Sequence, residues 1–210
     1  MNKIIKPLAS FLFLLLLWQL YIPKLEAGSP PLKGGKLPEI NLPIPKNPNE
    51  KEYLGLSGTG FFKIPQIKAK GVMIKIFNLY CPICQAIASE MNEIYQNIEN
   101  NPDLMGKIKI IGIGTGNSLY EVEVYRKKNN VLYPLFPDTD FSIHKALGEV
   151  GIPYFIATKM DGEGSHEVVH TQLGGFNGAG SFLELILDTY GFKGKGLPST
   201  KNNLAVSLPK

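Results

Sequence analysis

The middle of the chain alternates between short apolar runs and longer segments with a helical repeat of apolar residues. Residues 72–77 (VMIKIF) are almost continuously apolar and rich in β-branched side chains, which is typical of a buried central strand. Over 82–99, apolar residues recur every three or four positions, and Pro82 suits the first helical turn. A strand followed directly by a helix is therefore predicted over 72–99.

The same alternation continues to about residue 192 and sets the order of the elements. Further strands are predicted over 108–113, 132–136, 154–158 and 167–173, and further helices over 118–129, 140–147 and 181–190. Ser118 and Glu121 form a capping box at the start of the second helix, and Ser181 and Glu184 do so for the last. The order βαβαβα followed by ββα predicts an α/β fold with a central mixed sheet, helices on both faces and a terminal antiparallel hairpin.

The segments outside this pattern divide the chain into parts. Residues 28–52 contain six prolines among Gly, Lys and Asn, a composition that predicts a linker without a core. Residues 53–67 mix glycine with Phe and Ile, which predicts short strand pieces along an apolar edge. One folded domain is therefore expected over 53–192, and the polar residues 193–210 are expected to form a disordered tail.

The first 27 residues (1–27) have the character of an export signal. Lys3 and Lys6 precede a mostly apolar run over 8–22. The run is short for a membrane span and long for the core of a cleaved signal peptide, so a signal peptide and an N-terminal membrane anchor both stay open. Either interpretation places the protein in the periplasm or elsewhere outside the cytoplasm, and the second tethers it to the inner membrane.

Composition narrows the choice of partners and of cysteine chemistry. The chain has a net charge of +4, but its basic residues are 21 lysines and the single Arg126. Nucleic-acid-binding proteins normally use arginine guanidinium groups to recognise phosphates and base edges. With a single arginine, this chain is not expected to have nucleic acid as a partner. In an exported protein, a cysteine pair serves as a structural disulfide or a redox centre. The two cysteines are only three positions apart, so a disulfide between them would close too small a loop to stabilise the fold much.

Cys81 and Cys84 lie where the predicted strand meets the predicted helix. Cys81 falls at the N-cap, where unpaired backbone N–H groups favour a thiolate. Cys84 lies one turn inside the helix and is placed to attack a mixed disulfide formed on Cys81. The intervening Pro82 and Ile83 carry no charge, so they leave the redox direction open.

The Tyr-Cys-Pro-Ile-Cys motif over 80–84, the element order and Gly151-Ile152-Pro153 before a strand resemble the thioredoxin superfamily. The resemblance covers about residues 60–192 and is closest to the exported TlpA/ResA-like thiol-disulfide oxidoreductases. It implies a thioredoxin-like fold and dithiol–disulfide exchange without a bound cofactor or metal. By resemblance, Cys81, Cys84 and Pro153 are the catalytic residues.

The resemblance also implies roles for the residues around the motif. The proline corresponding to Pro153 is cis in that family and faces the disulfide. Ile152 would then offer its backbone to an extended substrate segment, with Tyr80, Pro82 and Ile83 as the other substrate-binding residues. Without the motif upstream, Pro153 would be no more than a loop proline that opens a strand.

Lys75 departs from the family pattern. Family members commonly carry a buried Asp or Glu six residues before the first cysteine, where it helps proton transfer to and from the second thiol. A buried lysine there would favour the thiolate and, with its own pKa lowered by desolvation, could take part in proton transfer as a neutral base. Alternatively, its ammonium reaches solvent at the sheet edge and has no redox role. Both interpretations stay open.

Four other patterns fit the sequence less well. Residues 166–170 (HEVVH) match a zinc-protease motif, but in a strand the two histidines would lie about 13 Å apart, too far to share one zinc ion. The glycines of 112–116 are similar to a dinucleotide loop but have the wrong last spacing. A copper chaperone that used His144 would need a C-x-x-x-C pair, and a peroxiredoxin would have Thr in place of Asn78.

The sequence therefore predicts an exported thiol-disulfide oxidoreductase that acts as a reductase on other extracytoplasmic proteins. It would exchange with protein disulfide or dithiol substrates and with a membrane or periplasmic electron-transfer partner. The alternatives are an oxidase that donates its disulfide, and a non-catalytic binding module that holds a partner in the groove beside Pro153.

Overall fold

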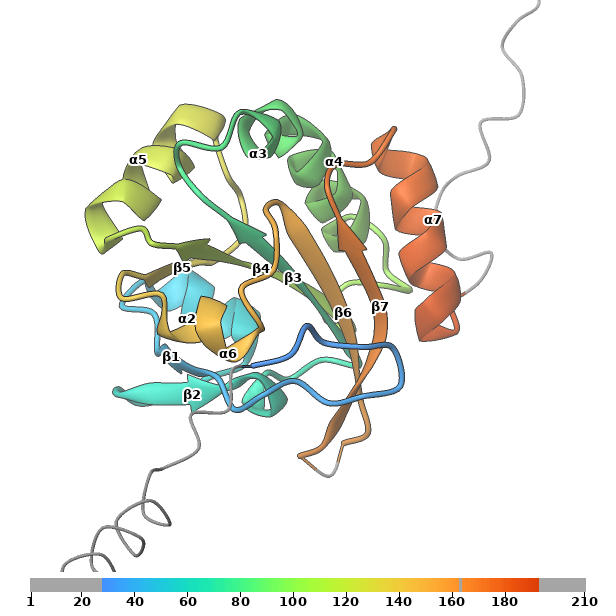
Figure 1. Ribbon diagram of the computed structural model, residues 1–210. Coiled ribbons are helices and arrows are strands. Elements are labelled where there is room, and N and C mark those ends of the chain that lie inside the picture. The colour runs from blue at the N-terminus through green and yellow to red at the C-terminus, as the bar shows by residue number, and fades with distance from the viewer. Residues whose placement is uncertain (1–27, 163, 193–210) are drawn as a thin grey trace, which may run out of the picture.

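A five-stranded mixed sheet forms the centre of the molecule (Figure 1). The computed structural model describes residues 28–162 and 164–192, so the predicted leader over 1–27 and the predicted tail over 193–210 lie outside the described residues. The strand order is β5-β4-β3-β6-β7. These strands are β3 (Gly71–Phe77), β4 (Ile108–Thr115), β5 (Leu135–Asp138), β6 (Tyr154–Met160) and β7 (His166–Leu173). The predicted α/β class with a central mixed sheet is confirmed.

Strand β3 is central, as its apolar sequence predicted. It pairs in parallel with β4 and antiparallel with β6, and all of its residues are buried. Strand β5 adds to β4 in parallel, and β6 with β7 forms the predicted antiparallel hairpin. A strand covered on both faces is expected to be apolar throughout, which makes Lys75 the exception in β3.

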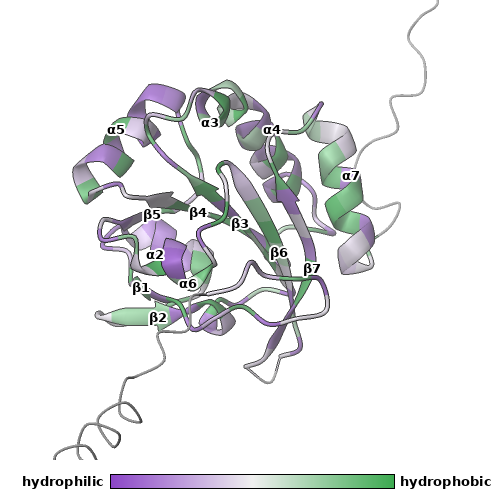
Figure 2. Ribbon diagram, in the orientation of Figure 1, coloured by the Kyte–Doolittle hydropathy of each residue, from purple (hydrophilic) through white to green (hydrophobic). Residues whose placement is uncertain are grey.

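Four helices cover one face of the sheet (Figure 1). They are α3 (Pro82–Ala86), α4 (Ala88–Glu99), α5 (Leu119–Asn129) and α7 (Ala179–Tyr190). Alternate side chains of β3, such as Met73 and Phe77, enter the core that these helices share. Helix α7 contains more hydrophobic residues than α5, which is mostly polar (Figure 2). Because α7 packs against both α4 and β7, it needs the more apolar sequence.

The opposite face is covered by α6 (Ser142–Ala146) and by the N-terminal part of the described chain. That part contains β1 (Asn41–Pro43), α2 (Pro48–Leu54), β2 (Phe61–Lys63) and the 3-10 helix η1 (Ile64–Gln66), with β1 and β2 paired antiparallel. Leu37, Ile40 and Leu42 are buried in the same core as Ile74 and Ile76 of β3.

The structure thus differs from the predicted Pro-rich linker over 28–52. This segment contributes a strand, a helix and several core side chains to the domain. Prolines restrict backbone hydrogen bonding, but the apolar residues between them can still be buried against a sheet. The partner of β1 is β2, which lies well downstream, so only tertiary pairing reveals this strand.

The same segment also extends the edge of the five-stranded sheet. The Gly34 N–H donates to Val168 O at 2.8 Å, and the Val168 N–H donates to Gly35 O at 2.8 Å. The Leu37 N–H donates to Nε2 of His166 at 3.0 Å. Part of the open edge of β7 is therefore occupied by this chain's own backbone.

Three elements show the clearest differences from the predicted bounds. The helix predicted over 82–99 is interrupted at Ile87, whose φ of −91° and ψ of 6° separate α3 from α4. The last helix begins at Ala179 rather than at Ser181, and the Gly178 N–H before it donates to Glu90 on α4 at 3.2 Å. The strand predicted over 132–136 is β5, displaced toward the C-terminus. Among the described helices, none is long and apolar enough to cross a membrane.

Candidate active site

The start of α3 holds Cys81 as its N-cap. Cys81 has an extended backbone, with φ −82° and ψ 112°, and Pro82 follows at the first helical position. The backbone N–H of Cys84 donates to Cys81 Sγ at 3.2 Å. The sulfur therefore occupies the place of the oxygen that caps most helices, where backbone N–H groups favour negative charge. Cys81 is partly exposed, so its sulfur can meet a partner.

Cys84 lies one turn further along α3 and is fully buried. Burial and, to a lesser extent, the hydrogen bond with Cys81 together raise the pKa of its thiol to about 12. Both cysteines are free thiols in this structure. The two sulfurs are therefore unequal: one is accessible at a helix start, and the other is a buried thiol that stays protonated at neutral pH.

Two asparagines hold the loop between β3 and α3. Asn78 Oδ1 accepts from the Tyr80 N–H at 2.8 Å, and Asn78 Nδ2 donates to Thr115 O at 2.8 Å. Asn117 Oδ1 accepts from the Leu79 N–H at 2.8 Å. These bonds fix the cysteine motif to the end of β4. This role was not predicted from the sequence, where the available signal was an asparagine one or two residues after each of two buried strand ends.

The Ile152–Pro153 peptide bond is cis, as the resemblance implied. Because Ile76 of β3 pairs with Tyr154 of β6, Pro153 lies beside the end of β3, where the loop to Cys81 begins. Ile152 is partly buried and, like Cys81, packs against the core beneath the four helices. The structure therefore brings the proline and the cysteines to the same end of the sheet.

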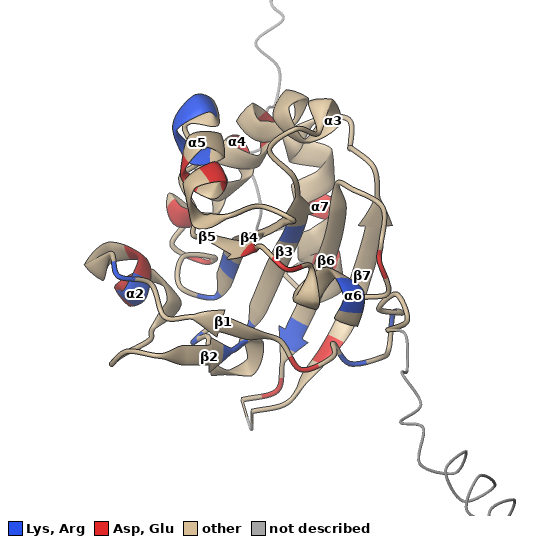
Figure 3. Ribbon diagram, turned by 60° about the vertical axis from the view of Figure 1, so that its left-hand side comes forward, with Lys and Arg blue, Asp and Glu red and all other residues tan. Residues whose placement is uncertain are grey.

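The surface beside Cys81 is apolar. The side chain of Tyr80 is 71% exposed and that of Ile83 is 51% exposed, while Pro82 is also exposed. Helix α3 itself carries no charged residue (Figure 3). The Tyr80 hydroxyl donates to Glu121 Oε1 at 2.9 Å, which anchors the ring at the rim of this surface. These side chains are open to a bound protein, and their role as substrate contacts stays a prediction.

Lys75 is fully buried beneath the motif, so the interpretation in which its ammonium reaches solvent is wrong. Its Nζ donates to Cys84 O at 3.3 Å and to the Tyr125 hydroxyl at 3.1 Å. Tyr125, on α5, donates its own hydroxyl to the same carbonyl at 2.7 Å. Burial lowers the pKa of Lys75 to about 8, and the charges of Cys84 and Cys81 oppose this shift. Tyr125 was not predicted at this site, because it lies 41 residues from Cys84 along the chain.

The zinc-protease pattern lies in strand β7 and not in a helix. His166 accepts from the Leu37 N–H on the face covered by the N-terminal segment. The ring of His170 packs against Phe182 of α7, on the other face. Because the two histidines point to opposite faces of the sheet, they cannot bind one zinc ion together.

The glycine-rich turn and His144 also have structural roles. Gly116 has a φ of 64°, and the Phe141 ring packs directly against its Cα, so a side chain fills the space that a dinucleotide would need. His144 Nε2 lies 2.8 Å from Val150 O, a contact that holds the turn after α6.

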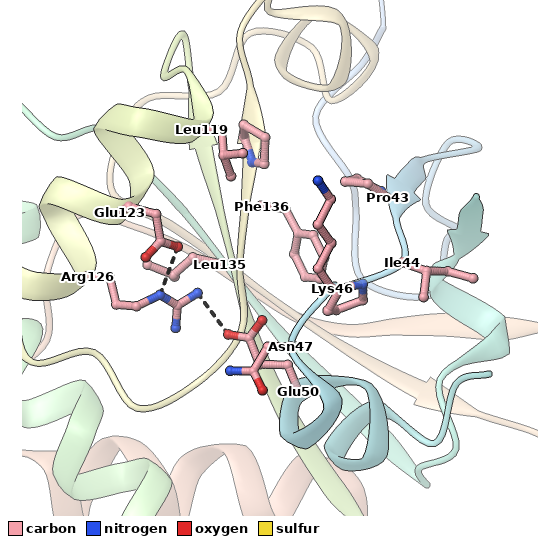
Figure 4. Close-up of a pocket in the computed structure, with 12 residues that line it drawn as sticks. Pro43, Ile44, Lys46, Asn47, Glu50, Leu119, Glu123, Arg126, Leu135 and Phe136 are labelled. Atoms are coloured by element: carbon pink, nitrogen blue, oxygen red, sulfur yellow. Dashed lines mark hydrogen bonds and ion pairs between the residues drawn. The ribbon is translucent and has the colours of Figure 1, made fainter. Parts of the chain in front are cut away.

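A cavity of about 430 Å³ opens between the N-terminal segment and α5–β5, and no residue of the cysteine motif lines it. Leu119 and Phe136 line its apolar wall (Figure 4). Arg126 at its edge is paired with Glu50 at 2.9 Å and with Glu123 at 3.1 Å. Two carboxylates thus compensate this guanidinium, and the pair with Glu50 ties the N-terminal segment to α5.

Comparison with known proteins adds the identity of the fold. No protein-family model and no curated protein sequence matches the chain. A thioredoxin-family thiol:disulfide interchange protein from Chlorobium tepidum TLS is 18% identical, with a TM-score of 0.52 over 76% of this chain and 98% of that chain. A protein from Bacteroides thetaiotaomicron, proposed to be a protein disulfide isomerase, is 18% identical, with a TM-score of 0.57 over 79% of this chain and 94% of that chain.

A third structure, the thioredoxin domain of a thiol-disulfide oxidoreductase from Bacteroides vulgatus, is 14% identical, with a TM-score of 0.51 over 69% of this chain and 90% of that chain. At such identities the similarity shows the fold. The chain has a thioredoxin-like fold, as the resemblance implied, with two cysteines at the start of its helix α3.

Proposed function

We propose that this protein is a thiol-disulfide oxidoreductase that exchanges disulfides with other proteins through Cys81 and Cys84. The observation that carries the proposal is the geometry of the pair: Cys81 Sγ is accessible and accepts a backbone N–H at a helix start, with the buried Cys84 thiol one turn behind it. Similarity to solved thiol-disulfide exchange proteins supports the fold that this chemistry uses.

The exchange proceeds in two balanced steps. The Cys81 thiolate attacks a substrate disulfide, a Cys81–substrate disulfide forms, and the substrate sulfur that leaves takes a proton from solvent. Cys84 then loses its proton and attacks Cys81 Sγ, so a Cys81–Cys84 disulfide forms and the second substrate sulfur leaves as a thiolate. The substrate gains two electrons, and a dithiol partner returns the protein to its reduced form.

The substrates are proposed to be extended segments of other exported proteins. Tyr80, Pro82 and Ile83 offer an uncharged, exposed surface beside Cys81, and Ile152 next to the cis proline lies at the same end of the sheet. An apolar segment around a cysteine would bury its side chains here while its backbone lies along Ile152. Export itself, by a cleaved signal or a retained anchor, rests on the pattern of 1–27.

The direction of exchange has two candidates. The resemblance favours a reductase supplied with electrons by a membrane or periplasmic partner. The buried Lys75 favours an oxidase, because a cation beside the pair stabilises the thiolate of the reduced form and so makes the disulfide easier to reduce. A potential near or below about −270 mV would indicate the reductase, and one near about −120 mV the oxidase.

An exchange assay with a model substrate tests the proposed activity. The full-length protein at catalytic concentration is expected to accelerate reduction of a disulfide-containing peptide by dithiothreitol, with turnover in excess of the enzyme added. The rate is read from alkylated peptide by mass spectrometry. Acceleration no greater than that given by an equal concentration of free cysteine would contradict the proposal.

A further inference from the structure

Lys75 is a cation in the core without a counter-charge. Its side chain is fully buried. It lies between those of Met73 and Phe77 along β3, on the face of the sheet that the four helices cover. No carboxylate among the described residues forms an ion pair with it. Its two hydrogen-bond partners, Cys84 O and the Tyr125 hydroxyl, are neutral. Such an environment disfavours the ammonium and favours the neutral amine.

The groups that can change charge next to Lys75 are the two thiols. Cys81 at the N-cap of α3 and Cys84 within α3 influence the pKa of Lys75 electrostatically. From α5, the phenol of Tyr125 faces its ammonium. Burial raises the pKa of Tyr125, and also that of the nearby Tyr133, so both phenols stay neutral over the working pH range. On the flanking strands, Lys75 is opposite Gly112 and Phe155, which do not ionise. The charge balance around Lys75 therefore depends on whether the cysteines are reduced.

We propose that Lys75 takes up a proton when the Cys81–Cys84 disulfide is reduced and gives it up when the disulfide forms again. This proposal rests on the proposed function and adds a coupling between its redox step and one buried residue. On reduction by a dithiol, the Cys81–Cys84 bond breaks and two electrons enter. One proton goes to Cys84, and the second goes to Lys75 Nζ, whose ammonium then balances the thiolate of Cys81. The hydroxyl of Tyr125 positions the amine for this role.

The direction of the coupling follows from electrostatics. In the dithiol form the pKa of Lys75 is about 8, because burial lowers it and the neighbouring Cys84 and Cys81 partly oppose that effect. In the disulfide form this raising effect is lost, so the pKa lies lower. At a pH between these two pKa values, reduction of the disulfide takes up one more proton than it would without Lys75. Each pH unit then changes the equilibrium constant for reduction by an extra factor of ten, which corresponds to about 30 mV in reduction potential.

The test is the pH dependence of the equilibrium between the full-length protein and a reference dithiol, measured from about pH 5 to pH 9. Wild-type protein is compared with Lys75→Met and with the control Lys109→Met. Lys109 is also a buried lysine of the sheet, but its ammonium pairs with Glu99 at 3.5 Å and lies 3.9 Å from the centre of the Tyr53 ring. Wild-type and Lys109→Met proteins are expected to show the extra proton between the lower pKa of Lys75 in the disulfide form and about pH 8, and Lys75→Met is expected to lack it.

A second measurement needs no variant. The chemical shift of the Lys75 ¹³Cε, followed by NMR in the wild-type protein, is expected to report a lower pKa in the disulfide form than in the dithiol form. Equal pKa values in the two forms, or parallel pH curves for wild type and Lys75→Met, would overturn the proposal while leaving disulfide exchange intact. Failure of wild-type protein to form a reversible disulfide would overturn both this proposal and the proposed function.

Discussion

In a Cys81→Ser variant, disulfide exchange is expected to fall to the uncatalysed rate, whereas Cys84→Ser is expected to accumulate a stable mixed disulfide with its substrate. The reason is the inequality of the two thiols: Cys81 is accessible at the helix start, and Cys84 is buried with a pKa of about 12. Attack by Cys81 does not need Cys84, but release of the product does. Non-reducing gel electrophoresis and intact mass measure the trapped species.

The chain offers an internal control for this experiment. It contains only these two cysteines, so each single variant leaves one thiol and no competing pair. A double variant provides the background for non-covalent binding. Equal trapping by the two single variants would contradict the assignment of Cys81 as nucleophile, and full substrate binding by the double variant would favour the binding-module alternative.

Lys75→Met is expected to stabilise the reduced protein by about 2 kcal/mol at pH 7. Burial lowers the pKa of Lys75 from 10.5 to about 8. The unfolded chain therefore binds more protons than the folded one between these values, and a shift of this size destabilises the folded state by about 3 kcal/mol below pH 8. Loss of the hydrogen bonds of Nζ offsets about 1 kcal/mol of the gain.

The destabilisation of the folded state by Lys75 is confined to a defined pH range, because the pKa of Lys75 is lower in the folded than in the unfolded chain. The destabilising effect of Lys75 is fully present below pH 8 and disappears as the pH rises toward 10.5, where the unfolded chain also carries a neutral amine. The gain from Lys75→Met, measured by urea unfolding under reducing conditions, is therefore expected to vanish near the upper value. A variant that is less stable than wild type at pH 7 would show that Lys75 is not a strained cation.

The sequence pattern was sufficient where an element depends on its own residues. The apolar run of β3, the Ser118–Glu121 capping box and the position of Cys81 at the start of a helix all follow from local chemistry, and the structure has each of them. Valines and a preceding turn indicated that 166–170 is a strand, which is how it folds. These features need no knowledge of distant residues.

The remaining features depend on contacts between distant segments. Residues 28–52 enter the core because β1 pairs with β2. In addition, Leu37, Ile40 and Leu42 pack against the face of the sheet that the four helices leave uncovered. At the start of α7, no side chain caps the helix, and the Gly178 N–H donates instead to Glu90 on another helix. Periodicity and propensity contain no information on such pairings.

The same distinction between local and distant contacts explains why the sequence left the role of Lys75 undecided. The position of Lys75 six residues before Cys81 could be read from the sequence, but its burial could not. That burial depends on α5, which places Tyr125 over the amine and over the Cys84 carbonyl. A charged residue in a central strand is thus a local signal whose meaning only the packing decides.

The redox equilibrium of the cysteine pair tests the central claim most directly. Full-length protein is equilibrated at pH 7 with mixtures of reduced and oxidised dithiothreitol or glutathione, then quenched and alkylated, and the fraction of each form is read by mass. The proposed function predicts one reversible two-electron transition between a dithiol and an intramolecular Cys81–Cys84 disulfide. A chain that stays in the dithiol form under oxidising buffers, or that forms only intermolecular disulfides, would contradict it.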